Sequence, residues 1–239
     1  MKEWKQAFWL AGTEWKNFSK HAVFTYTLCL LYIVIVFAFL PIFEGGTTIV
    51  GDILFIVIFL LFPAWIKPKE SHVQKISGEI RASPSFIMLQ QLPIRKNVIV
   101  KSRFIFHSFY SFPFQLTLLL CLYILTPEVR NMGFSAYLAF VIIWLAISIY
   151  IGFFLPTSDG GDIINWKTLL GSSLFFILLG AAILTLFHAV LDVGFVEWTI
   201  RIAQEFPLLS AIVSILLAAC GFFYWPRSLK KTMEKLDYL

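Results

Sequence analysis

The sequence predicts an all-α membrane protein, because of its composition, its six long apolar runs and the positions of its basic residues. Of its 239 residues, 59% are hydrophobic and only 14% are charged, and the mean hydropathy is +0.82. Soluble domains are typically about 45–50% apolar and about 25% charged. A soluble core of this size could not bury so much apolar surface, so lipid must act as the solvent.

Six apolar runs are each long enough for a membrane-spanning helix, which needs about 20 residues. They cover residues 22–43, 49–66, 104–126, 134–156, 169–191 and 207–226. The second run is short and carries Asp52 near one end, where we expect the carboxylate to reach water. We therefore expect a single transmembrane domain of six helices over residues 1–239.

The Lys and Arg residues are concentrated in alternate connections between these runs. Four lie in residues 1–20, eight in 67–103, one in 157–168 and four from 227 onward, whereas the other connections hold only Arg130 and Arg201. Because Lys and Arg accumulate in cytoplasmic loops, both termini are predicted to face the cytoplasm of a cell-membrane protein. This orientation accounts for the net charge of +5, and we expect no nucleic-acid partner.

Two segments outside the apolar runs have the pattern of helices that lie on a membrane surface. Residues 1–20 place lysines opposite an apolar face, which predicts an interfacial helix. That face consists of Trp4, Ala7, Phe8, Ala11, Trp15 and Phe18. Residues 194–206 predict a short helix with one apolar and one charged stripe. The stripes are Phe195, Trp198, Ile202 and Phe206, and Glu197, Arg201 and Glu205.

The longest polar connection, residues 67–103, contains a short apolar helix. Ser83-Pro84 is typical of a helix start, with the serine as N-cap, and Pro93 ends the helix. The apolar residues between them are Phe86, Ile87, Met88, Leu89 and Leu92. An exposed helix of this kind must bury itself against the protein, the membrane or a partner.

The sequence lacks the short motifs of common enzymes, including a Walker A loop, an H-E-x-x-H pair and a G-x-S-x-G turn. We therefore expect no enzymatic activity and no metal or cofactor bound by this chain. Asp159-Gly160-Gly161-Asp162 is interpreted as a turn, with a cation site as the alternative. His107 is expected at a solvated interface. His188 and Asp192 are expected to pair at a wet helix end, with a gate or proton site as the alternative.

The end of the connection contains Leu92-Pro93-Ile94, followed by Lys96, Ile99, Val100 and Arg103. This segment resembles the one before the third span of ABC-2 type transporter permeases. Arg95 and Val98 stand where that family has a small hydroxyl residue and an acid. The layout is also similar, since the family has an interfacial N-terminal helix, six spans, cytoplasmic termini and an extracellular helical element before the last span.

The resemblance implies a membrane subunit of an ATP-driven exporter. It further implies a dimer with a second permease copy or a paralogue, and separate ATPase subunits that bind ATP and Mg. The family's coupling helix, which docks on the ATPase, corresponds to residues 84–92. The candidate docking residues are Phe86, Met88, Leu89, Gln90, Gln91 and Leu92. The Phe-rich runs favour an amphipathic or hydrophobic substrate, such as a peptide, lipid or antibiotic, but indicate no substrate-binding residues.

Three other classes remain open. One is a non-transporting membrane scaffold or sensor partner. Another is the substrate-capturing subunit of an energy-coupling importer, although the long connection and the N-terminal helix count against it. The third is an intramembrane enzyme, although no catalytic cluster is apparent.

Overall fold

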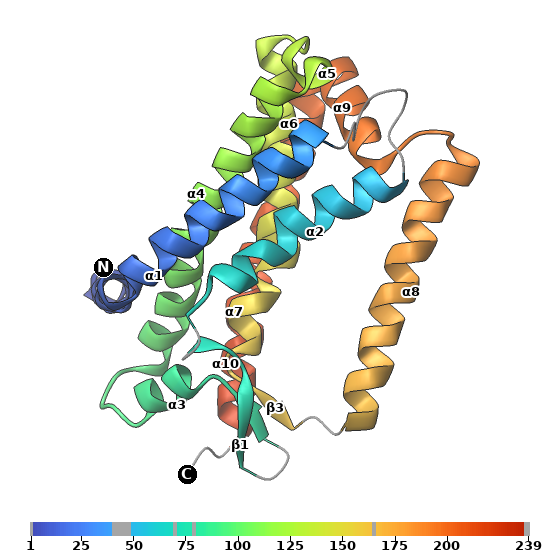
Figure 1. Cartoon of the computed structure of the whole chain (residues 1–239). Coiled ribbons are helices and arrows are strands. Elements are labelled where there is room, and N and C mark those ends of the chain that lie inside the picture. Colours follow the sequence, from blue (N-terminus) through green and yellow to red (C-terminus); the bar gives the residue numbers. More distant parts are fainter. Residues whose placement is uncertain (1, 40–48, 69–70, 78–79, 164–165, 237–239) are drawn as a thin grey trace.

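The chain folds into a helical bundle with one small sheet (Figure 1). This computed structural model describes residues 2–39, 49–68, 71–77, 80–163 and 166–236. The helices are α1 (Lys2–Phe39), α2 (Ile49–Ile66), α3 (Pro84–Gln90), α4 (Lys96–Leu125), α5 (Pro127–Arg130), α6 (Phe134–Ile147), the π-helical η2 (Ser148–Gly152), α7 (Phe154–Ser158), α8 (Trp166–Val190), α9 (Phe195–Glu205) and α10 (Pro207–Lys235). The strands are β1 (Gln74–Ser77), β2 (Ile80–Ala82) and β3 (Asp162–Ile163).

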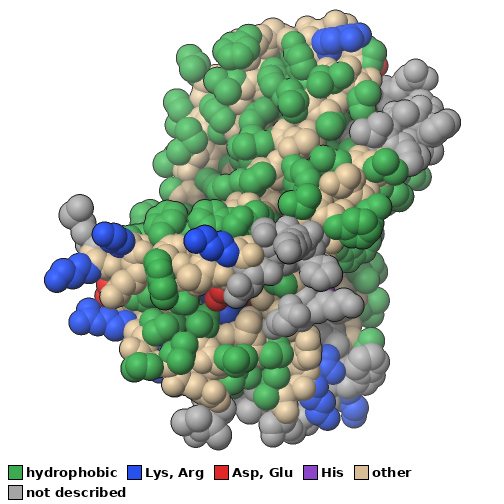
Figure 2. Space-filling model, turned by 60° about the vertical axis from the view of Figure 1, so that its left-hand side comes forward, with side chains coloured by type: hydrophobic (Ala, Val, Ile, Leu, Met, Phe, Trp, Pro, Cys, Tyr) green, Lys and Arg blue, Asp and Glu red, His purple; other side chains and the backbone are tan. Residues whose placement is uncertain are grey.

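Within the described ranges, five helices are long and apolar enough to cross a membrane, which is compatible with an all-α membrane protein. They are α2, α4, the continuous run from α6 to α7, α8 and α10. In α1, the apolar stretch whose side chains the structure describes, Val23–Ile33, is shorter than a membrane span. The end of the span expected over residues 22–43 lies outside the described residues. Figure 2 shows hydrophobic side chains covering the upper part of one face, with Lys and Arg side chains mainly at its left edge and lower end.

Two helices continue well beyond their apolar runs at the same end of the bundle. The helix α4 begins at Lys96 instead of 104, and α10 continues through Pro226 to Lys235. The end where these extensions, α3 and the sheet lie is called the basic end, and the end with α5 and α9 the opposite end (Figure 1). Hydropathy reveals only the apolar part of a helix, whereas its backbone hydrogen bonds continue through the polar residues beside that part.

The N-terminal segment is part of one helix, α1, where an interfacial helix and a separate first span were expected. Figure 1 shows its first part end-on and the rest from the side, so the axis changes direction between them. Of the expected apolar face, Ala7 and Ala11 are buried, whereas Trp4 and Phe8 are exposed. The small residues face inward because this part of α1 packs closely on α4.

The bundle core is built around Trp144 of α6, which is fully buried. Its ring meets those of Phe55 and Phe59 from α2 edge-on, at centroid distances of 4.5 and 5.2 Å. Its Nε1 donates a hydrogen bond of 3.2 Å to the hydroxyl of Thr199 on α9. This one side chain therefore joins α2, α6 and α9, and its polar atom is satisfied as burial requires.

The small sheet at the basic end has the order β1-β2-β3, with both pairs antiparallel. The first two strands form a hairpin, and β3 comes from the turn after α7. The pairing of β2 with β3 needs a glycine at position 161, because its φ is +79° and a Cβ atom there would clash with the carbonyl oxygen of Arg81. No strands were expected here, since segments of two to four residues carry no alternating pattern.

The helix α8 stands apart from the bundle and is attached at the opposite end (Figure 1). No residue of its apolar stretch Leu170–Val190 is buried. Near its last turn, the ring of Phe187 lies 5.2 Å from the rings of both Phe195 and Trp198. The sides of α8 are therefore open to lipid or to another chain.

Candidate functional site

The helix α3 starts where the sequence predicts, but the role of Ser83 differs. Its backbone carbonyl accepts bonds from the N–H groups of Phe86 and Ile87, at 3.0 and 3.1 Å, as an N-cap carbonyl should. Its hydroxyl makes no cap and instead lies 3.0 Å from the hydroxyl of Ser85. The N–H of Ser83 donates to the carbonyl of Asp159, so the start of α3 is held by the turn after α7.

The two faces of α3 have different surroundings. Phe86 and Leu89 are buried, and the side-chain amide of Gln90 is enclosed without a hydrogen-bond partner for its nitrogen among the described atoms. Met88 is 67% exposed and Leu92, just after the helix, is 49% exposed. Of the six candidate docking residues, the structure therefore leaves Met88, Gln91 and Leu92 on the surface.

The buried face of α3 belongs to a hydrophobic cluster that joins several parts of the chain. Besides α3, the cluster draws on α1, α4, the residue before α7 and α10. Its buried members are Leu10, Phe86, Leu89, Ile99, Val100, Phe104, Phe153, Leu229 and Met233. Because close-packed interiors deform little, a displacement of α3 must be shared by α4 and α10.

The family-like motif falls on the loop after α3 and on the first two turns of α4. Pro93 is exposed and Ile94 is half-buried against the cluster. The remaining motif residues lie on α4, where Lys96 is its first residue and the other three are buried: Ile99, Val100 and Arg103. The motif thus links a surface helix to a long helix of the bundle.

Arg103 is a buried cation with one carboxylate partner in the described structure. Its Nη1 lies 3.2 Å from Oε2 of Glu14, and its guanidinium carbon lies 5.7 Å from the ring centroid of Phe86. The other two guanidinium nitrogens have no hydrogen-bond partner among the described atoms. Burial raises the pKa of Glu14, although the positive charge of Arg103 acts in the other direction.

Lys67 and Asp159 form a second buried ion pair that the sequence did not predict. Lys67 follows α2, whereas Asp159 lies in the turn after α7. Burial lowers the pKa of Lys67 and raises the pKa of Asp159, and the opposite charge of each partner counteracts these shifts. The carboxylate of Asp159 therefore binds a lysine, which supports the turn interpretation of residues 159–162; the side chain of Asp162 lies outside the described part of the structure.

Asp52 connects three helices at the opposite end. Its side chain is fully buried and accepts hydrogen bonds from the N–H groups of Phe195 and Val196, the first residues of α9, at 2.5 and 3.0 Å. Its Oδ2 also lies 2.9 Å from Nε2 of His188 on α8. The carboxylate thus stabilises the positive end of the α9 dipole.

Two expectations for this end were wrong. Asp52 does not reach water, because α9 covers it. His188 pairs with Asp52 instead of Asp192, because α8 ends at Val190 and Asp192 adopts a left-handed conformation with φ 51°. The helical spacing that would bring residues 188 and 192 together is therefore lost.

The expected helix at residues 194–206 is confirmed as α9, and its ion pair between Arg201 and Glu197 is present. Its buried face, however, is made of Val196, Thr199, Ile200 and Ala203. Of the expected aromatic stripe, Phe195 and Trp198 instead contact Phe187 of α8. Smaller side chains face the bundle because they allow α9 to lie close to it.

His107 is also buried and not solvated as expected. Because α4 begins eight residues before the apolar run, His107 lies well inside the helix, where its Nδ1 lies 2.9 Å from the hydroxyl of Tyr110. Deeper in the bundle, Nε2 of Gln115 donates a 2.6 Å bond to the hydroxyl of Ser148 in η2. A π-helical segment often marks a functional position, and here it brings Ser148 to a polar contact with α4.

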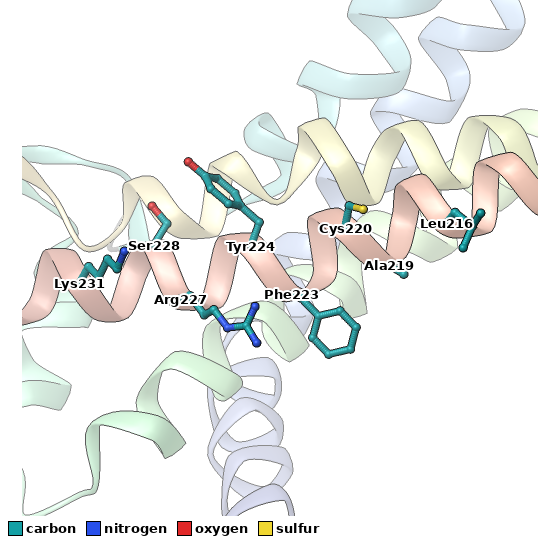
Figure 3. A pocket seen from close by; sticks show the side chains of 8 residues that line it. All are labelled: Leu216, Ala219, Cys220, Phe223, Tyr224, Arg227, Ser228 and Lys231. Atoms are coloured by element: carbon teal, nitrogen blue, oxygen red, sulfur yellow. The ribbon is translucent and has the colours of Figure 1, made fainter.

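In the described part of the chain, two hollows lie near the basic end. One, of about 440 Å³, lies between α1, α4 and α10. The other is an open hollow of about 780 Å³ along one side of α10, lined by the eight side chains in Figure 3. Arg227 and Phe223 line both, and Figure 3 shows them pointing to the same side of α10.

The five long apolar helices are compatible with a multi-pass membrane protein. No protein-family model, curated protein or solved structure matches the chain.

Proposed function

We propose that this chain is the membrane subunit of an ATP-driven transporter of the ABC-2 permease type. The observation that carries the proposal is the two-sided environment of α3. Met88 and Leu92 are exposed at the basic end, while Phe86 and Leu89 on the other face are fixed in the cluster with α4 and α10. A partner bound to the exposed side could therefore move long helices of the bundle.

The exposed side of α3 fits a partner groove that accepts a short helix. Large apolar side chains such as Met88 favour burial, by roughly 1.5–3 kcal/mol each when fully covered. The exposed residues Arg95 and Lys96 follow Leu92 closely in the sequence. An apolar anchor with a polar rim is the usual arrangement of a binding surface.

The proposal assigns ATP and Mg to a separate ATPase and places the basic end in the cytoplasm, with six spans and both termini inside. It also includes a second permease subunit. The exposed sides of α8 support this part, since a Cβ atom added to Gly171 or Gly180 would have no described atom of another element within 4 Å. Small residues allow close approach of helices in membranes. The cargo we favour is amphipathic or hydrophobic.

The test is to purify the tagged chain from its own host in mild detergent and measure bound ATPase protein and ATP hydrolysis. We expect Met88→Asp and Leu92→Asp to reduce both, because a charge would enter an apolar groove without a partner. Val73→Asp is the matched control, since Val73 is an exposed apolar residue outside α3.

Equal losses in Val73→Asp and Met88→Asp would refute docking at α3. If no ATPase accompanies the wild-type chain, the transporter proposal fails and a scaffold or sensor role takes its place.

A further inference from the structure

The hollow between α1, α4 and α10 has the lining of a site for a hydrocarbon chain. Its volume of about 440 Å³ falls within the range of about 300–1,000 Å³ that is usual for ligand pockets. Six aromatic side chains from the three helices line it: Trp4, Phe8, Phe104, Phe109, Phe222 and Phe223.

Two cations also line this hollow. Nζ of Lys101 lies 5.0 Å from the ring centroid of Trp4 and 2.9 Å from Oε2 of Glu3. The guanidinium carbon of Arg227 lies 5.8 Å from the ring centroid of Phe223. No carboxylate within the described ranges forms an ion pair with Arg227, so its donors remain open to an anion.

The position of Arg227 along α10 matches one edge of a bilayer. Arg227 lies 20 residues after Pro207, where the helix starts. At about 1.5 Å per residue this is roughly 30 Å, the thickness of a hydrocarbon core. The aromatic rings of Phe222 and Phe223 lie about one turn closer to Pro207 and hence at the depth of lipid chains.

We propose that this hollow binds an anionic phospholipid of the adjacent leaflet, with its phosphate at Arg227 and Lys101 and part of an acyl chain among the aromatic rings. The proposal does not depend on the transport function. Basic pockets between membrane helices commonly bind acidic lipid headgroups.

The free side of α10 supports a lipid over a soluble anion. Its open hollow changes from apolar Leu216 and Ala219 to basic Arg227 and Lys231 along one helix face (Figure 3). The acyl chain and the headgroup of a lipid follow the same order, from the membrane interior to its surface. Arg227 lines both hollows, so a second chain of the same lipid could lie along this face.

The experiment uses the full chain in detergent with equal amounts of phosphatidylglycerol and phosphatidylcholine, and measures retained lipid by native mass spectrometry. We expect preferential retention of phosphatidylglycerol. Arg227→Gln should reduce its affinity roughly fivefold, as expected for one surface cation. Lys230→Gln removes an exposed charge from the same helix, outside both hollows, and should have little effect.

Variants of the Glu3–Lys101 pair separate lipid binding from a structural role of Lys101. Lys101→Gln should weaken retention more than Glu3→Gln does, because both variants lose the ion pair but only the first loses a cation of the site. Equal retention in the two variants would mean that the pair only holds α1 in place, and the assignment of Lys101 would be overturned. Ser108→Trp should reduce retention of both lipids, because Ser108 lines the same hollow.

Equal retention of the two lipids by the wild type would overturn the proposal, as would equal effects of Arg227→Gln and Lys230→Gln. Glycerol 3-phosphate is added as a soluble competitor that has the headgroup chemistry without the chains. Displacement of the lipid by this competitor at comparable concentration would show that the site takes a soluble anion and not a lipid.

Discussion

Asp52 on α2 and His188 on α8 are 136 positions apart in the sequence, yet Oδ2 of the aspartate lies 2.9 Å from Nε2 of the histidine. The same carboxylate accepts the first two N–H groups of α9. Since the sides of α8 are otherwise exposed, this contact is a principal attachment of α8 to the bundle.

Asp52→Asn should lower the free energy of unfolding by about 2 kcal/mol, because a neutral side chain binds the N–H groups of α9 less strongly than the buried carboxylate does. Thermal unfolding of the detergent-purified protein measures the change. Asp192→Asn is the control, since Asp192 is exposed and should tolerate the same substitution. Equal effects of the two variants would contradict the attachment role of Asp52.

The Lys67–Asp159 pair should behave as a coupled buried pair. Lys67→Met or Asp159→Asn alone should each cost about 3 kcal/mol, because each leaves an uncompensated buried charge. The double variant should cost clearly less than the sum of the two. Unfolding in mixed detergent micelles gives the four free energies of the cycle.

The exposed pair Arg201–Glu197 provides the control for this cycle. Arg201→Met should cost less than about 1 kcal/mol, as is usual for exposed ion pairs. Additive effects of Lys67→Met and Asp159→Asn would show that the two buried side chains do not stabilise each other.

The two faces of α3 should differ in their contribution to stability. Leu89→Ala should cost about 2–3 kcal/mol, because it opens a cavity in the cluster that contains Phe86 and Leu229. Met88→Ala should change the free energy of unfolding by less than about 0.5 kcal/mol, since its side chain is mostly exposed. The reverse order would mean that α3 packs on the bundle by its other face.

The attachment of the first turns of α1 should depend on pH. The hydrogen bond and the charge of Lys101 lower the pKa of Glu3 from its ordinary value of 4.5. Since the pKa of Glu3 is lower in the folded than in the unfolded protein, the ion pair is fully stabilising above pH 4.5. This stabilisation is lost as the pH falls through the folded pKa of Glu3.

Spin labels at Gln6→Cys and Asn97→Cys, in a background without Cys29, Cys121 and Cys220, report this attachment as a distance. The distance distribution should broaden upon acidification below 4.5, and it should be independent of pH in this range when Glu3 is replaced by Gln. A transition that persists in Glu3→Gln would assign the change to another group.

The predicted orientation can be tested with single cysteines in the same background. Asn131→Cys should react with an impermeant thiol reagent in intact cells, whereas Val73→Cys should react only after permeabilisation. Both residues are exposed and lie near opposite ends of the bundle, so the contrast depends on the membrane side alone. Labelling of Val73→Cys with protection of Asn131→Cys would show that the orientation is the reverse of the predicted one.

The sequence by itself determined the approximate positions of the long apolar helices, which are compatible with a membrane protein, since apolar length is a local property. It also determined α9 and the start of α3, because the charge spacing of Glu197 and Arg201 and the Ser83-Pro84 step act within a few residues. No comparable local signal existed for the two-residue strand β3 or for the left-handed Asp192.

The tertiary structure decided the partners of the buried charges. Asp52 with His188, Lys67 with Asp159 and Glu14 with Arg103 are each separated by about 90 residues or more. It also decided that Phe86 lies inside and Met88 outside, although both belong to one apolar run. The physical reason is that hydropathy sets how strongly a side chain avoids water, whereas the packing of distant helices decides which side chains are shielded from water and which charges meet.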